Sequence, residues 1–334
     1  MERSKPAYFD SFHCLAGACP DSCCKEWAVD IDSATAASYR ALPGPLGDQL
    51  RQVLQETEDG TVMTIENGRC PMWQQDGLCR IQAALGHDAL CQVCQQFPRL
   101  RHEYGDFEEL GLELSCPEAA RLILTAPDLA PITETVPGDD TPDYDVEAMA
   151  ILRESRTMLL NFLTDTGYSV PQALAVMLLY AYEVQSGLDT GQTPVLDPNR
   201  TLADATQYAG TATMQALFGF FQELEILTDR WRILLDAGPR SFQWSSVHRA
   251  LARYFVNRYW LQAVWDYDVI SRTKLGITAC LLVCAMGGDP VETAQLFSKE
   301  IENDPDNVEA VLDGAYTSPA LTDTALLGLL LSSS

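Results

Sequence analysis

The sequence has little positive charge. Lysine occurs only four times in 334 residues, and 22 Lys and Arg stand against 47 Asp and Glu, which gives a formal net charge of −25. Binding to nucleic acids or to anionic membranes depends on clustered basic side chains, so this composition argues against both kinds of partner. An acidic surface can attract a cationic partner, although a salty habitat or a GC-rich genome produces the same bias, and the genomic explanation is the one we favour.

Long hydrophobic runs are also absent. The longest are GITACLLVCAM (276–286) and ALLGLLL (325–331), well short of the ~20 residues that span a bilayer. The first residues, MERSKPAYFDSFH, contain no apolar segment typical of a signal peptide. We therefore expect a cytoplasmic protein without a membrane partner, and its 47% hydrophobic residues are sufficient for a substantial core.

Cysteine, in contrast, is concentrated in one part of the chain. Nine of the 11 cysteines lie in the first 116 residues: Cys14, Cys19, Cys23, Cys24, Cys70, Cys79, Cys91, Cys94 and Cys116. In a cytosolic chain such clustering favours metal binding or catalysis over disulfides. Unrelated buried thiols would explain one such residue, but they explain nine much less well. The other two, Cys280 and Cys284, fit an apolar buried helix.

The first cysteine cluster has the spacing C-x4-C-x3-C-C within CLAGACPDSCC (14–24), where small and turn-forming residues let the backbone fold around one centre. Adjacent cysteines seldom both reach one metal, so Cys23 and Cys24 are expected to differ in role. A set of ligands made only of thiolates suits zinc or an iron–sulfur cluster. Because no C-x2-C…C-x2-C zinc ribbon is present, the iron–sulfur cluster is the interpretation we favour.

The pattern of the chain predicts a mainly α protein in two parts. Residues 1–126 form a cysteine-rich α+β metal-binding module, with strands expected in 27–32, 61–66 and 107–114 and helices beginning at Ser33, as N-cap, and at Pro117. Residues 127–145 are rich in proline and acids and predict a linker. The remainder, 146–334, is expected to be all-helical, with helices over 145–166, 171–185, 201–236, 244–268, 269–287, 290–303 and 305–315.

Four stretches of the first part carry a family resemblance. In order they are FHCLAGACPDSCCKEWAVDIDSATAASYRAL, CPMWQQDGLCRIQAALG, CQQFPR and LELSCPEAARLIL, which together cover roughly residues 8–125. As an ordered set they resemble the flagellin lysine-N-methylases, which belong with cysteine-cluster proteins described as zinc- or iron-chelating. A weaker similarity, ARYFVNRYWLQAVWDYDVISRTKLGI (252–277), extends the resemblance into the helical part.

The resemblance also implies a set of metal-site residues. The motif cysteines of the family fall on Cys14, Cys19, Cys23, Cys24, Cys70, Cys79, Cys94 and Cys116. Cys91 stands where a serine or another small residue is expected, so it is left out. Four thiolates suffice for the [4Fe–4S] cluster that the resemblance implies, and zinc is the alternative. The sequence does not say which four bind; we favour Cys19, Cys23, Cys79 and Cys94.

The activity implied by the resemblance is methyl transfer from S-adenosylmethionine to lysine side chains of flagellin. The sequence has neither the Gly-rich turn of the usual methyltransferase nor the C-x3-C-x2-C triplet of many radical enzymes. An iron–sulfur cluster is then the natural anchor for S-adenosylmethionine, since an iron without a protein ligand could take the methionine amine and carboxylate. Whether the transfer is polar or radical is not determined by the sequence.

Lysine methylation requires a neutral amine, yet with a reference pKa near 10.4 only about one lysine in ~2,500 is neutral at pH 7. Glu118 could accept the amine proton, and Arg99 and Arg121 could hold a carboxylate of the cofactor, because all three adjoin motif cysteines. The simpler interpretation, which we favour, is that Glu118 completes a helix N-terminus and that the arginines pair with nearby acids.

Two other functions remain open at this stage. One is a non-enzymatic structural or interaction protein that binds zinc or iron, and the other is an iron–sulfur protein that only carries electrons. Binding of S-adenosylmethionine would separate the methyltransferase from both, and the identity of the metal would separate the zinc protein from the others. The sequence does not determine the oligomeric state.

Overall fold

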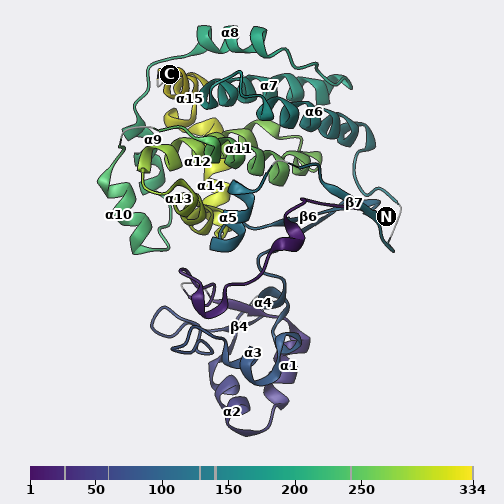
Figure 1. Cartoon of the computed structure of the whole chain (residues 1–334), viewed down its shortest axis with the longest axis vertical. Coiled ribbons are helices and arrows are strands. Elements are labelled where there is room, and N and C mark those ends of the chain that lie inside the picture. Colours follow the sequence, from purple (N-terminus) through teal and green to yellow (C-terminus); the bar gives the residue numbers. More distant parts are fainter. Residues whose placement is uncertain (26–27, 59, 128, 139–140, 241–242, 333–334) are drawn as a thin grey trace.

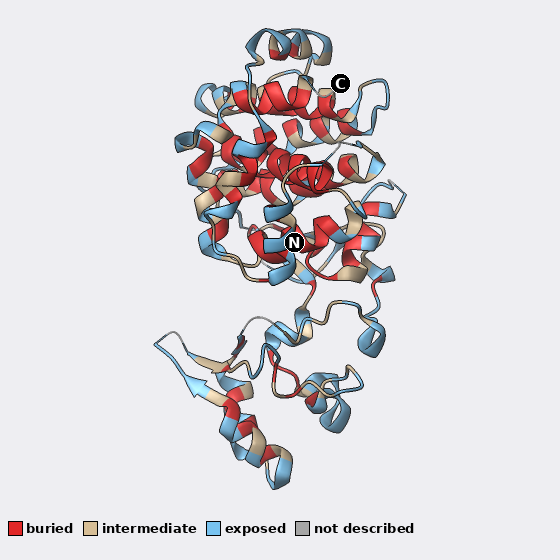
Figure 2. Cartoon of the chain, turned by 90° about the vertical axis from the view of Figure 1, so that its left-hand side faces the viewer, coloured by how far each residue is buried: buried red, intermediate tan, exposed pale blue. Residues whose placement is uncertain are grey.

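The structure, a computed structural model, describes residues 1–25, 28–58, 60–127, 129–138, 141–240 and 243–332. It has two hydrophobic cores. One lies in a small lobe, whose core residues run from Val29 to Cys91, and the other lies in a large helical body. Figure 1 shows the small lobe below the body, and Figure 2 shows that the buried residues are concentrated in the body.

The small lobe is built on a three-stranded antiparallel sheet in the order β2 (Val29–Ile31), β4 (Thr61–Met63) and β3 (Leu54–Glu56). Four short helices accompany it: α1 (Ser33–Ala41), α2 (Gly44–Val53), α3 (Arg80–Leu85) and α4 (Gln92–Gln96). Strand β2 alternates buried and exposed residues, as half-buried strands do. The predicted strands at 27–32 and 61–66 are confirmed at β2 and β4, although Trp27 lies outside the described residues.

A second sheet lies where the small lobe meets the body. Its strand order is β5 (Arg99–Glu103), β6 (Phe107–Leu112), β1 (Glu2–Lys5) and β7 (Ile132–Thr135), with β1 parallel to β6. Helix α5 (Pro117–Thr125) follows, and its apolar face joins the core of the body. Residues 104–124 therefore pack with the helices, although they precede the predicted linker.

The body contains ten further helices of the described chain: α6 (Val146–Thr164), α7 (Val170–Thr190), α8 (Pro198–Tyr208), α9 (Met214–Gln222), α10 (Asp229–Ala237), α11 (Ser246–Tyr259), α12 (Val269–Met286), α13 (Pro290–Phe297), α14 (Pro305–Thr317) and α15 (Asp323–Leu331). Among described helices, α12 alone is long and apolar enough to cross a membrane, and 94% of it is buried inside the body. It packs against α7, α11 and α14. The predicted mainly α class with an α+β N-terminal part is confirmed.

Short local signals determine where these helices begin. An Asp-Pro pair starts α8, α13 and α14, and the carboxylates of Asp197, Asp289 and Asp304 accept backbone N–H groups of the first turn. The proline that follows has no backbone N–H group, which costs nothing here because the N–H groups of the first helical turn have no acceptor within the helix. Helix α7 starts with a capping box at Ser169 and ends at Gly191, which has the left-handed φ of 70° that glycine adopts without strain.

Three local predictions were wrong. Asp32 rather than Ser33 caps α1, since its carboxylate accepts the Thr35 N–H at 3.0 Å. The helix expected over 201–236 is three helices, because Thr213 and Thr228 each cap a new one. Helix α15 was missed because it is apolar on all sides and shows no periodic stripe.

The segment 127–145 was predicted to be a linker. Part of it forms β7, which pairs antiparallel with β1, and residues 128 and 139–140 lie outside the described residues. The domain boundaries at 126 and 145 stay predictions.

Candidate metal centre

The loop of residues 14–24, here called the cysteine loop, connects the body to the small lobe. It carries Cys14, Cys19, Cys23 and Cys24 and contains one short 3-10 turn, η2 (Ala16–Ala18). Ala16 has a positive φ of 49°, a backbone conformation that is uncommon for a residue with a Cβ atom. The Ala16 N–H donates to the sulfur of Cys14 at 3.4 Å, and the Cys19 thiol donates to the Asp21 carbonyl at 3.3 Å. The loop thus holds two of its sulfurs with its own backbone.

Direct backbone contacts join the cysteine loop to the second cysteine motif. The Cys70 N–H donates to the Cys24 carbonyl at 2.8 Å, and Lys25 and Arg69 form an isolated antiparallel bridge beside it. A second close approach involves Gly17 of the cysteine loop and the loop that leads to Cys79. A Cβ atom on Gly17 would be 2.6 Å from the Asp76 carbonyl oxygen. Cysteines about 50 residues apart in sequence are therefore brought to one region by close backbone packing.

Three of the remaining cysteines stand at the starts of helices. Cys79, Cys91 and Cys116 are the N-cap residues of α3, α4 and α5. Helix α4 is held against the small lobe because the Asp32 carboxylate, which caps α1, also accepts the Gln92 N–H at 3.0 Å. The second motif and the CQQFPR motif therefore reach the site through helix ends on a common core.

Electrostatic interactions among the thiols show which of them are neighbours. The first group, Cys14, Cys19, Cys23 and Cys116, combines the cysteine loop with the start of α5. The second group, in the small lobe, contains Cys24, Cys70, Cys79, Cys91 and Cys94. A hydrogen bond between the side chains of Cys23 and Cys24, and an electrostatic interaction between Cys23 and Cys94, connect the two groups. All 11 cysteines of the chain are free thiols.

In two thiol pairs a hydrogen bond favours the thiolate of one partner. The side-chain hydrogen bond from Cys23 lowers the pKa of Cys24, and the bond from Cys94 lowers the pKa of Cys91. The same bonds raise the pKa of Cys23 and Cys94. Burial also raises the pKa of Cys70, to about 12. Each pair can therefore supply one thiolate, which is the form that binds metals.

The donor chemistry fits a soft metal or an iron–sulfur cluster, because the gathered side chains are all sulfurs. Within the described ranges, no three His, Cys, Asp or Glu side chains lie close enough to hold an ion as they stand. The thiols meet in pairs instead. Cys14, Cys23 and Cys94 are exposed, so a change of side-chain rotamer could bring them to a shared centre.

Cys91 is the residue of this region that the sequence analysis left out. The structure places it in a hydrogen-bonded pair with Cys94, a predicted ligand. The signal that could have identified it is the C-x2-C spacing of CQVC, which places both residues at the same helix start.

The similarity of the chain to known proteins is limited to a few relatives. No family model matches the chain, and neither does any solved structure. It is 33% identical over 144 residues to the flagellar biosynthetic protein FliU of Salmonella muenchen, and the match covers 39% of this chain and 82% of FliU. The chain belongs to the FliU family. It is also 33% identical over 144 residues to the lysine-N-methylases of Salmonella typhimurium and Salmonella choleraesuis, of which it covers only 34%.

The three polar candidates next to the motif cysteines occupy different positions. Arg121 donates two hydrogen bonds to Glu118, at 2.8 and 2.6 Å, one turn apart on α5. This hydrogen bonding lowers the pKa of Glu118, so its carboxylate is a weak base near neutral pH. The guanidinium of Arg99 on β5 lies 5.2 Å from the centre of the Phe12 ring. Their roles in catalysis and cofactor binding stay predictions.

An ion pair that was not predicted from the sequence joins the cysteine loop to the body. Asp21 lies between Cys19 and Cys23, and its carboxylate accepts hydrogen bonds from Lys299 at 3.1 and 3.2 Å and from Gln295 at 2.9 Å. No local signal in the sequence points to this pair, because the burial of Lys299 against Asp21 depends on how distant elements pack.

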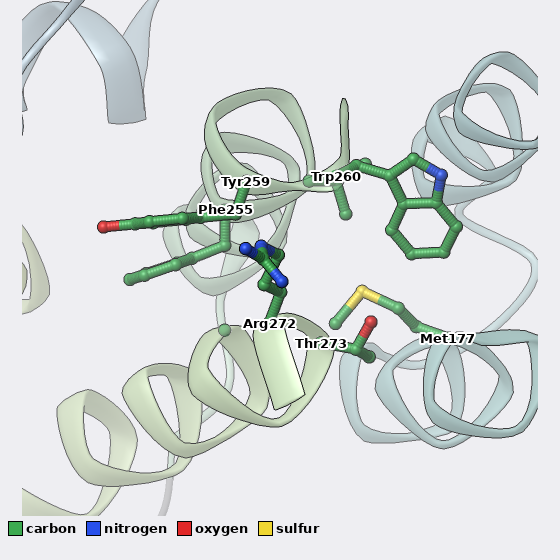
Figure 3. Close-up of a pocket in the computed structure, with 8 residues that line it drawn as sticks. Met177, Phe255, Tyr259, Trp260, Arg272 and Thr273 are labelled. Carbon is green, nitrogen blue, oxygen red and sulfur yellow. The ribbon is translucent and has the colours of Figure 1, made fainter. Parts of the chain in front are cut away.

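Cavities in the body do not extend the site. One, of about 10 Å³, lies between α7, α11 and α12 and is lined by Met177, Tyr259, Trp260 and Arg272 among others (Figure 3). It is about the size of one water molecule. A surface groove of about 540 Å³ runs along residues 210–216 and 319–325 and has no charged residue in its lining. Neither cavity is lined by a cysteine.

Proposed function

We propose that this chain is an S-adenosylmethionine-dependent protein-lysine N-methyltransferase with a [4Fe–4S] cluster at its cysteine site. The observation that carries the proposal is the combination of 33% identity to proteins named lysine-N-methylase and nine cysteines in the cysteine loop, the small lobe and the start of α5. The chain spans 34% of the length of those relatives, so its activity is inferred from the shared segment and from its own residues.

The residues proposed to hold the cluster are four of the cysteines predicted above. Thiolates of Cys19 and Cys23 from the cysteine loop and of Cys79 and Cys94 from the small lobe would bind iron. The cluster would supply an iron that binds the amine and carboxylate of S-adenosylmethionine. The protein supplies the rigid backbone that brings both sides together, at the contacts of Gly17 and Cys24 described above.

Flagellin is the proposed substrate, and the cytoplasm is the proposed place of the reaction. The support for the substrate is the name of the FliU relative, a flagellar biosynthetic protein. An acidic chain of net charge −25 also attracts lysine-bearing segments, because long-range attraction between opposite charges speeds encounter. A lysine must still lose its proton before its nitrogen can take a methyl group, so a site that desolvates the ammonium or offers it a base is required.

The cluster is tested by anaerobic purification of the full chain followed by iron, sulfide and zinc analysis. The expected result is about four irons and four sulfides per chain, as a [4Fe–4S] cluster requires, with a broad absorbance near ~400 nm that dithionite bleaches. Stoichiometric zinc without visible colour would overturn the cluster and favour the zinc-binding structural protein instead.

The activity is tested by incubating the full chain with flagellin and S-adenosylmethionine and measuring the mass of flagellin. The expected result is added methyl groups on lysine, which Cys23→Ser and Cys94→Ser abolish together with iron binding. Cys284→Ser is the matched control, because Cys284 is buried in α12, away from the site. If flagellin stays unmodified although the wild-type chain is loaded with iron, the proposed methyltransferase activity is wrong and an electron-carrying iron–sulfur protein is favoured instead.

A further inference from the structure

Two side chains on one face of the helical body form hydrogen bonds to two cysteine-bearing segments at once. Gln295 and Lys299 are four residues apart, at the end of α13 and in the π-helical turn η5 (Ser298–Glu302) that follows it. Lys299 and Gln295 both bind the carboxylate of Asp21 in the cysteine loop. Gln295 also donates to the Ser115 carbonyl at 2.6 Å, directly before Cys116.

These contacts lie next to the first group of thiols. Asp21 separates Cys19 from Cys23, and its own carbonyl accepts the Cys19 thiol. Ser115 precedes Cys116, which interacts electrostatically with Cys19. Fixing Asp21 and Ser115 on one helical face therefore fixes the separation between the cysteine loop and the start of α5.

The ion pair between Lys299 and Asp21 is buried, so the free energy of removing both charges from water opposes its formation. The side chain of Lys299 is 3% exposed and that of Asp21 is 14% exposed. Lys25 adds a second ion pair to Asp21, with 2.6 Å between Nζ and Oδ1. Removing charges from water costs several kcal/mol per ion and is recovered only with good geometry. Three side chains, Lys299, Lys25 and Gln295, therefore converge on the Asp21 carboxylate and hold it against the body.

The π-helical turn is itself held rigidly on the opposite side. The side chain of Glu302, at the end of the turn, is fully buried and accepts hydrogen bonds from Tyr254 at 3.0 Å and Tyr259 at 2.9 Å on α11. Its carboxylate also pairs with Arg258, with 2.9 Å between the nearest atoms. Single π-helical turns are rare and are frequent at functional sites. Lys299 is thus anchored to the core of the body through α11.

We propose that Lys299 and Gln295 are positioning residues for the metal centre, and that they set the geometry of Cys19, Cys23 and Cys116 through Asp21 and Ser115. The inference rests on the proposed function in that it takes these thiols to bind a metal. Residues that orient metal ligands through a second contact typically change metal affinity by about 10- to 100-fold when they are mutated.

The test measures binding of Zn²⁺ alone, as a thiolate probe, to the full chain under anaerobic conditions by competition with a chromophoric chelator. Lys299→Met is expected to weaken binding at least tenfold, and Asp21→Asn to do the same. The double variant is expected to bind no more weakly than Asp21→Asn, because that change already removes the Lys299 ion pair along with the other contacts of the carboxylate. Lys274→Met is the matched control, since Lys274 is equally buried and pairs with Asp323 in the body.

A second measurement separates this inference from the proposed function. The rate of alkylation of each thiol by iodoacetamide, mapped by mass spectrometry without metal, is expected to rise at Cys19 and Cys116 in Lys299→Met and to stay unchanged at Cys70. Wild-type metal affinity and alkylation rates in Lys299→Met, or equal losses in Lys274→Met, would overturn the positioning role. If the wild-type chain binds no metal, the proposed cluster fails and the alkylation rates alone decide the inference.

Discussion

Replacing Gly17 by alanine should displace the cysteine loop without changing any thiol. A Cβ atom at this position would lie 2.6 Å from the carbonyl oxygen of Asp76, in the loop that leads to Cys79. The Cβ atom is fixed to the Cα atom of residue 17 and the carbonyl oxygen belongs to the backbone of Asp76, so neither can rotate away as the end of a flexible side chain would. Since ordinary contacts of a Cβ atom begin at 3.4 Å, one loop must move by about 0.8 Å.

A shift of this size exceeds what a metal site tolerates. Metal–ligand distances are held within about 0.2 Å, and functional groups must be placed to within about 0.5 Å. We therefore expect Gly17→Ala to lower metal affinity by about 10- to 100-fold, the range seen when the support of metal ligands is disturbed. The added strain should also reduce the free energy of unfolding by about 1–3 kcal/mol.

The assay is competition for Zn²⁺ together with iron and sulfide content after anaerobic purification, and urea unfolding gives the stability. Gly219→Ala is the matched control, because a Cβ atom there meets nothing within 4 Å in the interior of α9. Alanine should stabilise that helix by about 0.5–1 kcal/mol and leave metal binding unchanged. Wild-type metal content in Gly17→Ala would refute the close approach of the two loops as a determinant of the site.

Three further predictions concern the body. Burial lowers the pKa of His248 from 6.5 to about 4, so the unfolded chain binds one more proton than the folded chain between these pH values. The free energy of unfolding should therefore fall by about 3 kcal/mol as the pH drops from 6.5 to 4. The variant His248→Gln should remove that pH dependence in urea titrations. Ser155→Ala should cost about 1–3 kcal/mol, because the buried Trp260 indole N–H loses its acceptor at 3.1 Å, and an unchanged urea midpoint would contradict this. Gly314→Ala should lower the melting temperature, since its Cβ atom would lie 2.7 Å from the Phe220 ring.

Local sequence signals predicted the starts of several helices, among them α5, α13 and α14. The Asp-Pro pairs and Pro117 start helices because a capping carboxylate and a proline act within one turn. Prediction failed where the signal was ambiguous. Helix α15 is apolar on all sides, and Thr213 and Thr228 divide a segment whose periodicity suggested a single helix.

The cysteine clustering was predictable in composition but not in arrangement. Nine cysteines in the first 116 residues, in an acidic chain poor in lysine, are visible in the sequence and indicate thiolate chemistry. Their spacing does not say which thiols pair. Cys91 with Cys94 and Cys23 with Cys24 are close in sequence, whereas Cys116 joins the first group only because α5 packs on the body.

The sequence by itself therefore determined the fold class, most helix starts and the sulfur chemistry, since each depends on residue type or on neighbours within a few positions. Only the tertiary structure decided how the cysteine loop is held. Asp21 and Lys299 are 278 residues apart, and nothing in either segment indicates the other. Long-range pairing depends on how whole elements pack, and the packing of α13 and its π-helical turn against the cysteine loop creates the contact.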